Sequence, residues 1–335
     1  MNSKLTDGFR QKPQEKNRFS QLISDVINVL FIEKRLPYRL KFLLEDRLYR
    51  QKTEKAIEAV NGTPGISLQK PFKAEIHMLM NKKHVNMAIL ALKSFLRFFS
   101  NVCIVIHGDG SIDEDTERLL KHHIKGIRVI RLKDAEEIFK NQTTLFHARK
   151  GYLSIHITML KLLDIHFLSN KNKLIIMDSD VIFTNRPDEI ISWIEDNENC
   201  NLYARPYLKN LKMDKDALRN KFGPISFIEK FNSGLLCINK KLITLELILD
   251  TLEKLEGDNR MPVFGDESVW TVVFSRSSSR ELAFDDYPLF SESRYLRRFV
   301  KKGKDEKMNY LHFILKHHGG FYAKFARRVV SDLRQ

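Results

Sequence analysis

The spacing of apolar residues changes along the chain, and the change falls near residue 61. Over residues 19–60 apolar positions recur every three or four residues, and Pro37 interrupts the pattern before it resumes. The first of these positions are Leu22, Ile23, Val26, Ile27 and Leu30. We therefore expect a basic, amphipathic helical appendage over residues 19–60, preceded by a polar, disordered tail over residues 1–18. The loop sequence Asn61-Gly-Thr-Pro-Gly separates it from a larger domain expected over residues 70–335.

Strand-like and helix-like patterns alternate after that loop. Four short apolar runs predict strands, at residues 74–80, 102–106, 127–132 and 174–177. Three amphipathic stretches between them predict helices, at residues 85–99, 113–122 and 152–168. This alternation predicts an α/β fold with a Rossmann-like, mostly parallel central sheet flanked by helices. Ligands of such sheets bind beyond the carboxyl ends of the strands, where Asp109, Asp178 and Asp180 are expected.

Residues 174–183 read LIIMDSDVIF, an apolar run followed by two carboxylates one residue apart. Positions i and i+2 of an extended strand point to the same side, so Asp178 and Asp180 are expected to emerge together. Two convergent carboxylates favour a cation between them, and their oxygens suit Mg²⁺ or Mn²⁺. Because a metal held there can bind a diphosphate, this segment indicates an enzyme that uses a nucleotide sugar.

The same spacing of aspartates occurs at two other places, Asp113-Glu-Asp115 and Asp214-Lys-Asp216. The first lies in an acidic segment that is typical of a helix start, and the second lies in a charged stretch. Only Asp178-Ser-Asp180 ends a strand-like apolar run and precedes a loop signal. We therefore interpret the other two pairs as surface residues.

Three later segments add polar side chains to buried surroundings. Phe231-Asn-Ser-Gly234 predicts a tight turn before a short buried strand, Gly265-Asp-Glu267 places two carboxylates at the head of an apolar helix, and His312-Phe313 comes last. Each has a simpler interpretation: Asn232 as an ordinary turn residue, and Asp266 with Glu267 as a charge pair at a helix N-terminus. Isolated histidines in apolar stretches are interpreted as core residues, namely His77, His156 and His166.

Taken in this order, the segments resemble GT-A-type glycosyltransferases, and specifically glycosyltransferase family 8, over about residues 74–320. The resemblance implies a GT-A-like catalytic domain over residues 70–335. It also implies a retaining, metal-dependent enzyme that moves a sugar from a nucleotide diphosphate sugar to a glycan or lipid-linked acceptor, as in polysaccharide biosynthesis. In that family the donor is a UDP-sugar and the metal is Mn²⁺, for which Mg²⁺ is the alternative here.

The resemblance also implies roles for individual residues. Asp178 and Asp180 match the metal-binding pair, and His312 matches the third ligand, with His317 and His318 as the alternatives because the following residues depart from the family's pattern. Asp266 and Glu267 match a pair close to the donor sugar and the acceptor, and Lys161 stands where relatives carry an arginine that neutralises donor phosphate. We expect these three residues to act in catalysis. The expected contacts of the nucleotide sugar are Asp109, Lys161, Asp178, Ser179, Asp180, Asn232 and Gly234.

The net charge of +15 indicates an anionic partner. Basic residues are dense near both ends of the chain, at Arg35, Arg39, Lys41, Arg47, Arg50 and Lys52, over 297–307 and over 316–328. An anionic membrane surface or an anionic glycan or lipid-diphosphate acceptor would suit them, and a solvated basic face is the simpler alternative. No nucleic-acid-binding motif is recognised, so nucleic acid is not an expected partner.

The chain shows no secretory leader, and no apolar run approaches the ~20 residues that span a membrane. Two of its three cysteines lie in apolar runs, which is typical of free thiols in a reducing compartment. We therefore expect a cytoplasmic protein, peripheral on the inner face of a membrane.

Two other functions remain alternatives to an EC 2.4 glycosyltransferase of the hexosyltransferase type. A sugar-phosphate nucleotidyltransferase also uses carboxylate-bound metal, but it needs a glycine-rich phosphate loop after the first strand, and residues 80–84 contain no glycine. A non-catalytic basic protein that binds anionic membranes or nucleic acid would explain the charge. It would give no reason for the aspartate pair at the strand end.

Overall fold

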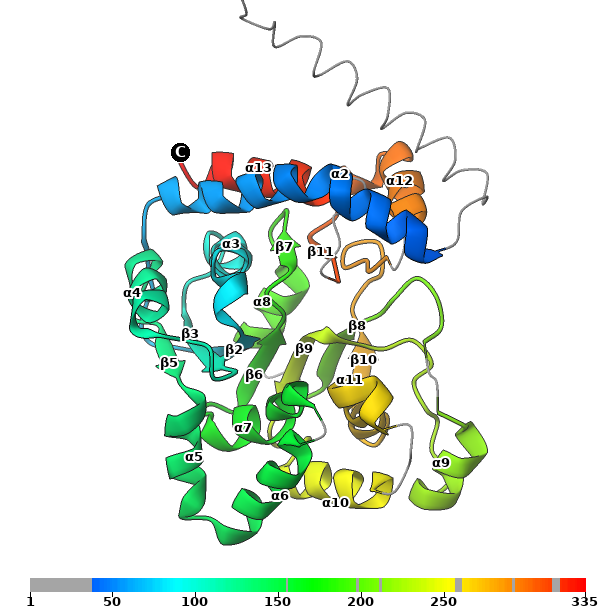
Figure 1. Ribbon diagram of the computed structural model, residues 1–335. Coiled ribbons are helices and arrows are strands. Elements are labelled where there is room, and N and C mark those ends of the chain that lie inside the picture. The colour runs from blue at the N-terminus through cyan, green and yellow to red at the C-terminus, as the bar shows by residue number, and fades with distance from the viewer. Residues whose placement is uncertain are drawn as a thin grey trace, which may run out of the picture. The chain divides into compact units, whose positions relative to one another are not determined.

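The computed structural model describes residues 38–154, 156–196, 199–210, 213–256, 261–290, 293–314 and 320–335 (Figure 1). The chain divides into two units, residues 1–51 and 52–335. The expected tail and the first expected helix of the appendage lie outside the described residues. Helix α2 (Tyr38–Glu58) begins where the pattern resumes after Pro37. Its last residues belong to the second unit, in whose hydrophobic core Ala56 and Ile57 are buried.

A seven-stranded sheet organises the second unit, in the order β10-β8-β9-β6-β2-β3-β5. Its strands are β2 (Ala74–Met80), β3 (Val102–Gly108), β5 (Arg128–Ile130), β6 (Lys173–Met177), β8 (Asn201–Ala204), β9 (Asn232–Asn239) and β10 (Ser279–Glu281). Strands β6, β2, β3 and β5 pair in parallel, as do β10 and β8, while β9 runs antiparallel to both of its neighbours. The predicted α/β fold with a mostly parallel sheet is therefore confirmed.

Helices cover both faces of this sheet because successive strand residues point to opposite sides. Along β6, Ile175 and Met177 pack in one hydrophobic cluster, whereas Leu174 and Ile176 pack in the other. The first cluster includes buried residues of α3 (Val85–Leu96), α4 (Glu114–His123), α8 (Asp188–Glu195), α12 (Ser293–Lys301) and α13 (Phe321–Asp332). The second includes residues of α5 (Leu132–Lys140), α7 (Leu160–Leu168), α9 (Lys215–Phe222), α10 (Leu245–Leu255) and α11 (Met261–Ser275) (Figure 1).

Short elements complete the second unit. Two small ladders join β1 (Ile66–Ser67) to β4 (Ile124–Lys125) and β7 (Val181–Phe183) to β11 (Tyr310–His312). The 3₁₀ turns are η1 (Ala59–Gly62), η2 (Lys82–His84), η3 (Ile157–Met159) and η4 (Lys304–Glu306). The antiparallel β7–β11 ladder matters most for function, because it brings the late part of the chain to the end of β6.

Two of the expected elements are wrong in detail. The helix expected over residues 152–168 is interrupted: α6 (Thr143–Leu153) ends early, and α7 begins only at Leu160. His156 causes the break, since its backbone is extended and its side chain accepts a hydrogen bond from the Thr158 amide. The turn expected at Asn232 and Gly234 lies inside β9, because β8 supplies a pairing partner for Asn232 across a bulge.

The described residues contain no helix that is both long enough and apolar enough to cross a bilayer. All three cysteines, Cys103, Cys200 and Cys237, are free, as expected.

Candidate active site

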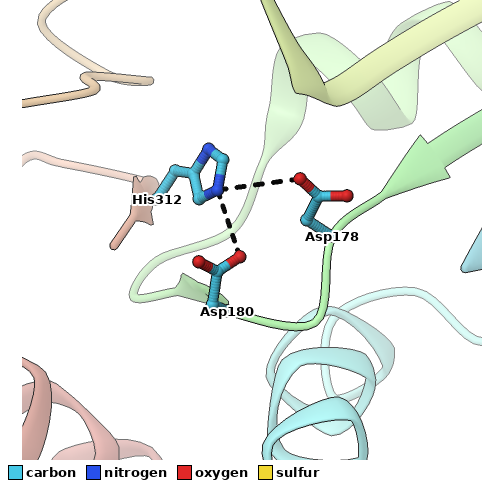
Figure 2. A group of neighbouring side chains, drawn as sticks. All are labelled: Asp178, Asp180 and His312. Carbon is cyan, nitrogen blue, oxygen red and sulfur yellow. Dashed lines mark ion pairs between the residues drawn. The ribbon is translucent and has the colours of Figure 1, made fainter. Parts of the chain in front are cut away.

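Asp178, Asp180 and His312 bring their metal-binding atoms together beyond the carboxyl end of β6 (Figure 2). His312 Nε2 lies 3.1 Å from Asp180 Oδ1 and 3.8 Å from Asp178 Oδ2. One ligand atom of each residue lies within 4.8 Å of the others. Two carboxylates and an imidazole are a donor set that suits Mn²⁺, so the residues present fit a divalent metal.

Backbone pairing holds the main chain of these residues in place. The Asp178 amide donates to the Gly234 carbonyl at 2.9 Å, and the Phe313 amide donates to the Asp180 carbonyl at 3.1 Å. Between these bonds, His312 on β11 pairs with Val181 on β7. Residues more than a hundred positions apart in sequence are thus joined by one ladder, which fixes the relative position of the imidazole and the two carboxylates.

Gly234 leaves the space that the His312 ring occupies. A Cβ at this position would lie 2.3 Å from His312 Cε1 and 2.6 Å from His312 Nδ1, far closer than van der Waals contact allows. Any larger residue would therefore displace the imidazole. Gly234 supports the site from behind the ring and does not line the pocket itself.

Lys161 supplies a buried positive charge beside the acidic residues. It lies in the first turn of α7, and its Nζ is 2.5 Å from Asp178 Oδ1 and 3.6 Å from Asp266 Oδ2. Burial disfavours a charged ammonium group, but the two carboxylates outweigh burial and raise the pKa of Lys161 above its ordinary value. Lys161 therefore stays protonated at neutral pH.

The pKa of His312 is also raised. Burial disfavours the imidazolium, but the charges of Asp180 and Asp178 and a hydrogen bond to Asp180 outweigh it. A divalent metal would have to displace the proton from Nε2 in order to bind there.

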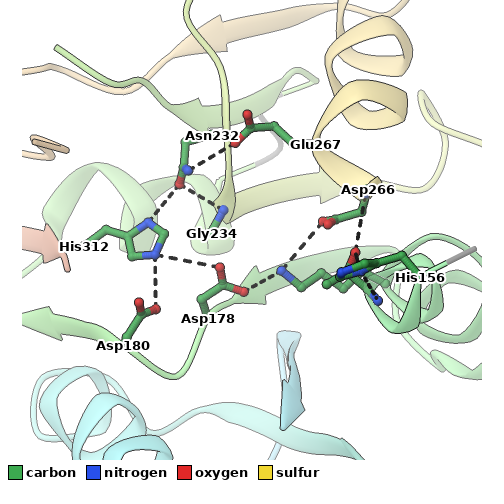
Figure 3. A network of polar contacts seen from close by, with 10 residues as sticks. His156, Asp178, Asp180, Asn232, Gly234, Asp266, Glu267 and His312 are labelled. Carbon is green, nitrogen blue, oxygen red and sulfur yellow. Dashed lines mark hydrogen bonds and ion pairs between the residues drawn. The ribbon is translucent and has the colours of Figure 1, made fainter. Parts of the chain in front are cut away.

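Gly265 allows Asp266 and Glu267 to reach the same pocket. Its backbone has φ of +55° and ψ of −141°, which interrupts α11 immediately before the two acidic residues. Residues other than glycine rarely adopt this backbone conformation. A Cβ at this position would also lie 2.9 Å from Thr158 Oγ1. The Asp266 amide lies 3.5 Å from the same hydroxyl, so the turn η3 before α7 meets the start of the α11 segment that carries the two acidic residues (Figure 3).

One open pocket of about 440 Å³ collects nearly all of the residues that the sequence singles out. Its lining includes Asp109, Lys161, Asp178, Ser179, Asp180, Asn232, Asp266, Glu267 and His312. Asp109 lies just past β3, where its Oδ1 accepts hydrogen bonds from the amide and hydroxyl of Ser111. His317 and His318 lie outside the described residues.

Sequence reasoning missed several residues around this pocket. Thr158 lines it, and Asn210 lies behind Glu267, donating to Glu267 Oε1 at 3.1 Å. Neither belongs to a recognisable motif, because each acts through contacts made across the fold. Of the three histidines interpreted as core residues, His77 and His166 are buried, but His156 is exposed because it lies in the break between α6 and α7.

The surface interpretation of the other aspartate pairs agrees with the structure. Asp113 and Asp214 are N-cap residues of α4 and α9, where their side chains accept hydrogen bonds from the Thr116 and Ala217 amides. Both pairs lie outside the pocket.

Comparison with known proteins identifies the family. The sequence model described as glycosyl transferase family 8 matches residues 75–313. No curated protein matches the chain. Among solved structures, the galactosyltransferase LgtC, in complex with donor and acceptor sugar analogs, is 12% identical with a TM-score of 0.50; the match covers 75% of this chain and 95% of that one.

Two further structures are similar. The bifunctional glycosyltransferase WbbM is 12% identical with a TM-score of 0.50, and the match covers 78% of this chain and 51% of that one. The glycosyltransferase GlyE of Streptococcus pneumoniae TIGR4 is 16% identical with a TM-score of 0.48, over 78% of this chain and 63% of that one. The chain thus spans less than two thirds of the GlyE chain. LgtC and WbbM support the GT-A fold, while the family rests on the sequence match.

The match covers most of the chain, and it favours a glycosyltransferase over the nucleotidyltransferase and the non-catalytic binding protein. The chain belongs to glycosyl transferase family 8 and is a glycosyltransferase.

Proposed function

We propose that this enzyme transfers a sugar from a nucleotide diphosphate sugar to a glycan or lipid-linked acceptor, with a divalent metal bound by Asp178, Asp180 and His312. The observation that carries the proposal is the convergence of this triad with the buried Lys161 in one pocket. A diphosphate needs positive charge around it, and the chain provides both a metal-binding donor set and an ammonium group. Mn²⁺ is the metal we propose, with Mg²⁺ as the alternative.

A bound metal would supply Lewis acidity toward the diphosphate. The protein's own contribution is electrostatic and positional. Lys161 is held between Asp178 and Asp266, where it can move toward donor phosphate and stabilise the charge that develops on the leaving group. As a point charge it does so without the two-pronged geometry of an arginine.

Asp266 and Glu267 are proposed to orient the sugar and the acceptor. Asp266 Oδ2 is buried, lies 3.6 Å from Lys161 Nζ and accepts no hydrogen bond from the described residues, so it keeps acceptor capacity for a sugar hydroxyl. Asn232 and Asp109 also line the pocket, where donor contacts would be made. Retention of configuration and a UDP-sugar donor are proposed from the family resemblance. A front-face attack assisted by the leaving phosphate would need no nucleophile on the protein.

The decisive experiment is a panel of nucleotide sugars, assayed for hydrolysis and transfer with Mn²⁺, with Mg²⁺ and after treatment with a chelator. We expect one donor, a UDP-sugar, to be consumed in a metal-dependent way. NMR of the first-formed product would give the anomeric configuration. Full activity in the chelator would contradict the metal-dependent part of the proposal. Cleavage to a nucleoside triphosphate in the presence of pyrophosphate would instead indicate a nucleotidyltransferase.

We further propose that the enzyme meets its acceptor at an anionic membrane surface on the cytoplasmic side. Exposed basic residues on and beside α12 and on α13 support this: Arg298, Lys301, Lys302, Lys324, Arg327 and Arg328. The apolar residues Leu296 and Phe299 of α12 are buried in the core, so attraction would be electrostatic and not by insertion.

Co-sedimentation with anionic phospholipid vesicles at low and high salt tests this surface. The variant Lys301→Glu/Lys302→Glu should weaken binding, because each charge near such a surface contributes about 1 kcal/mol. Truncation before Gly62 is a poorer test, since it removes Ala56, Ile57 and Val60 from the core. Binding that is unaffected by both salt and the double substitution would rule this surface out.

A further inference from the structure

A chain of hydrogen-bonding groups connects Asn210 with His312. Asn210 Nδ2 donates to Glu267 Oε1 at 3.1 Å, and Asn232 Nδ2 lies 3.5 Å from Glu267 Oε2. Asn232 Oδ1 in turn lies 3.0 Å from His312 Nδ1. Figure 3 shows the part of this chain from Glu267 to the two carboxylates beyond the imidazole. Neither family membership nor metal chemistry explains why Asn210 takes part in this series of hydrogen bonds.

The partners of Asn232 determine which way its amide points. The Gly234 amide lies 2.9 Å from one end of this group, and a backbone N–H can only donate. That end must therefore be the oxygen. The nitrogen then faces Glu267, whose carboxylate can only accept when it is ionised. Both contacts require the same orientation, so the amide cannot flip without losing both.

The orientation of the Asn232 amide determines which ring nitrogen of His312 carries a hydrogen. The Asn232 oxygen can only accept, so His312 Nδ1, 3.0 Å away, must carry a hydrogen. The other ring nitrogen, Nε2, faces Asp180 and Asp178. When one ring nitrogen of a histidine donates to such a partner, the other ring nitrogen is held toward the metal site. Outer partners fix histidine ligands in this way at metal centres.

Asn210 anchors the far end of the chain. Its side-chain oxygen accepts from the Phe231 amide at 3.0 Å, and its nitrogen donates to the Phe231 carbonyl at 2.5 Å. Its carboxamide is thus fixed on the residue that precedes β9, while the same nitrogen reaches Glu267. Without Asn210, one oxygen of Glu267 would lose a donor.

We propose that Asn210, Glu267 and Asn232 form a relay that holds His312 in the tautomer and orientation needed to bind a divalent metal. The three are positioning residues: they act through His312, in addition to any contact of Asn232 and Glu267 with the sugar. The inference rests on the proposed function for the metal itself. It assigns Asn210 a role in metal affinity although its side chain does not line the pocket.

The test is the affinity for Mn²⁺ alone, measured by calorimetry and by the EPR signal of free Mn²⁺, without nucleotide or acceptor. Asn232→Leu keeps the side-chain volume but removes the acceptor, and Asn210→Ala removes the anchor. We expect Asn232→Leu to weaken Mn²⁺ binding by about tenfold or more, in the range for loss of an outer partner. Asn210→Ala should weaken it less, but measurably.

A reciprocal exchange separates the relay from simple packing. Asn232→Asp alone sets two carboxylates face to face, whereas Asn232→Asp with Glu267→Gln restores a donor opposite an acceptor and leaves the net charge unchanged. The double variant keeps an oxygen toward His312 Nδ1. We therefore expect it to recover most of the Mn²⁺ affinity that either Asn232→Leu or Asn232→Asp loses.

The matched control is Asn239→Leu at the other end of β9. Asn239 is as buried as Asn232, and its oxygen likewise accepts from a backbone amide, that of Lys241. Its loss should leave Mn²⁺ binding unchanged. Melting temperatures of all variants report whether they are folded.

Wild-type Mn²⁺ affinity in Asn232→Leu or Asn210→Ala would overturn the relay, as would an equal loss in Asn239→Leu or no recovery in a folded double variant. Any of these outcomes would leave sugar transfer by the wild type untouched. Conversely, if the wild type bound Mn²⁺ with an affinity that depended on the relay but transferred no sugar, only the proposed function would be contradicted.

Discussion

Two copies of the same aspartate spacing have opposite fates in this protein. Asp178 and Asp180 lie between β6 and β7, where they converge with His312, whereas Asp113 and Asp115 lie at the start of α4. The Asp180 side chain is 5% exposed, and that of Asp115 is 79% exposed. The spacing therefore carries no chemistry of its own. What differs is the backbone on which the carboxylates are placed.

Each pair also has a lysine, and the two lysines differ in the same way. Lys161 is buried against Asp178, while Lys82 forms an ion pair with Asp113 in which both side chains are about half exposed. Water screens the exposed pair, and such pairs contribute little to stability. Lys161 and Asp178 interact in a lower dielectric and next to further carboxylates. Of the two lysines, only Lys161 therefore offers a weakly screened positive charge to a bound diphosphate.

The strongest test of this contrast is to neutralise one carboxylate in each pair. Asp180→Asn should abolish Mn²⁺ binding and transfer, a loss larger than the ~10–100-fold that removal of an outer partner causes. Asp115→Asn should change neither, because its carboxylate is exposed and does not line the pocket. Calorimetry with Mn²⁺ and an assay of the two variants decide the matter. Unchanged Mn²⁺ affinity in Asp180→Asn would disprove the proposed metal site.

Gly234→Ala should cause a smaller loss of Mn²⁺ affinity, although all three proposed ligands stay in the sequence. The added methyl group would lie 2.3 Å from His312 Cε1, so the imidazole must move away from the two carboxylates. We expect Mn²⁺ affinity to fall by at least about tenfold. Gly151→Ala, at which a Cβ would meet nothing within 4 Å, is the control. If both glycine variants bound Mn²⁺ alike, the close approach to the ring would be unimportant.

Exchanging the two lysines for alanine compares the buried charge with the exposed one. Lys161→Ala should reduce the turnover of the donor by about 10²–10³-fold, as loss of a group that stabilises developing charge does. It should also weaken UDP binding more than uridine binding, since only UDP carries the phosphates. Lys82→Ala should leave both affinities within a few-fold. Equal losses for UDP and uridine in a folded Lys161→Ala would indicate a structural role.

The pH dependence should also distinguish the two regions. The pKa of His312 is raised from its ordinary value of 6.5, so the imidazolium persists to higher pH and competes with the metal. Apparent Mn²⁺ affinity should therefore rise with pH, by up to about tenfold per unit below that pKa, and level off above it. The pKa of Asp113 is lowered by its hydrogen bonds with Lys82 and Thr116, so its cap stays ionised throughout. A flat Mn²⁺ affinity from about pH 6 to about pH 8 would contradict this reasoning.

The smallest expected effect is on the helix cap. Asp113→Ala removes the acceptor for the Thr116 amide, which lies 2.9 Å away, and should lower the melting temperature by about 2–4 °C. Turnover should not change. Differential scanning fluorimetry and the transfer assay together would show a purely structural role. A loss of transfer at full stability would place Asp113 in the function after all.

Much of the fold could be predicted from the sequence because its signals are local. The strands at 74–80 and near 174–177 and the helix at Val85 appear where the apolar periodicity predicts them. The alternation of these periods predicts parallel pairing, since a strand and the next one are joined by a covering helix. Where local signals conflict, prediction fails: the apolar pattern runs through Ser154 and His156, but the backbone of His156 is extended.

The residues of the candidate site also differ in whether a local sequence signal marks them. Asp178 and Asp180 could be found because they follow a buried strand directly, and family resemblance added Asn232, Asp266 and His312. Nothing in the sequence around Asn210 or Thr158 marks either residue, since their partners Glu267 and Asp266 are 57 and 108 residues away in the chain. Contacts of such separation leave no periodic trace.

The sequence by itself determined the alternation of strands and helices and the position of two carboxylates at the end of a buried strand. Both follow from hydrophobic periodicity, which acts over a few residues. Only the tertiary structure decided which aspartate pair would meet a histidine, because that depends on β11 pairing antiparallel with β7. It also decided the orientation of His312, through Gly234 and Asn232 on β9. The physical reason is that hydrogen bonds and close packing between distant segments form only when the whole sheet is assembled.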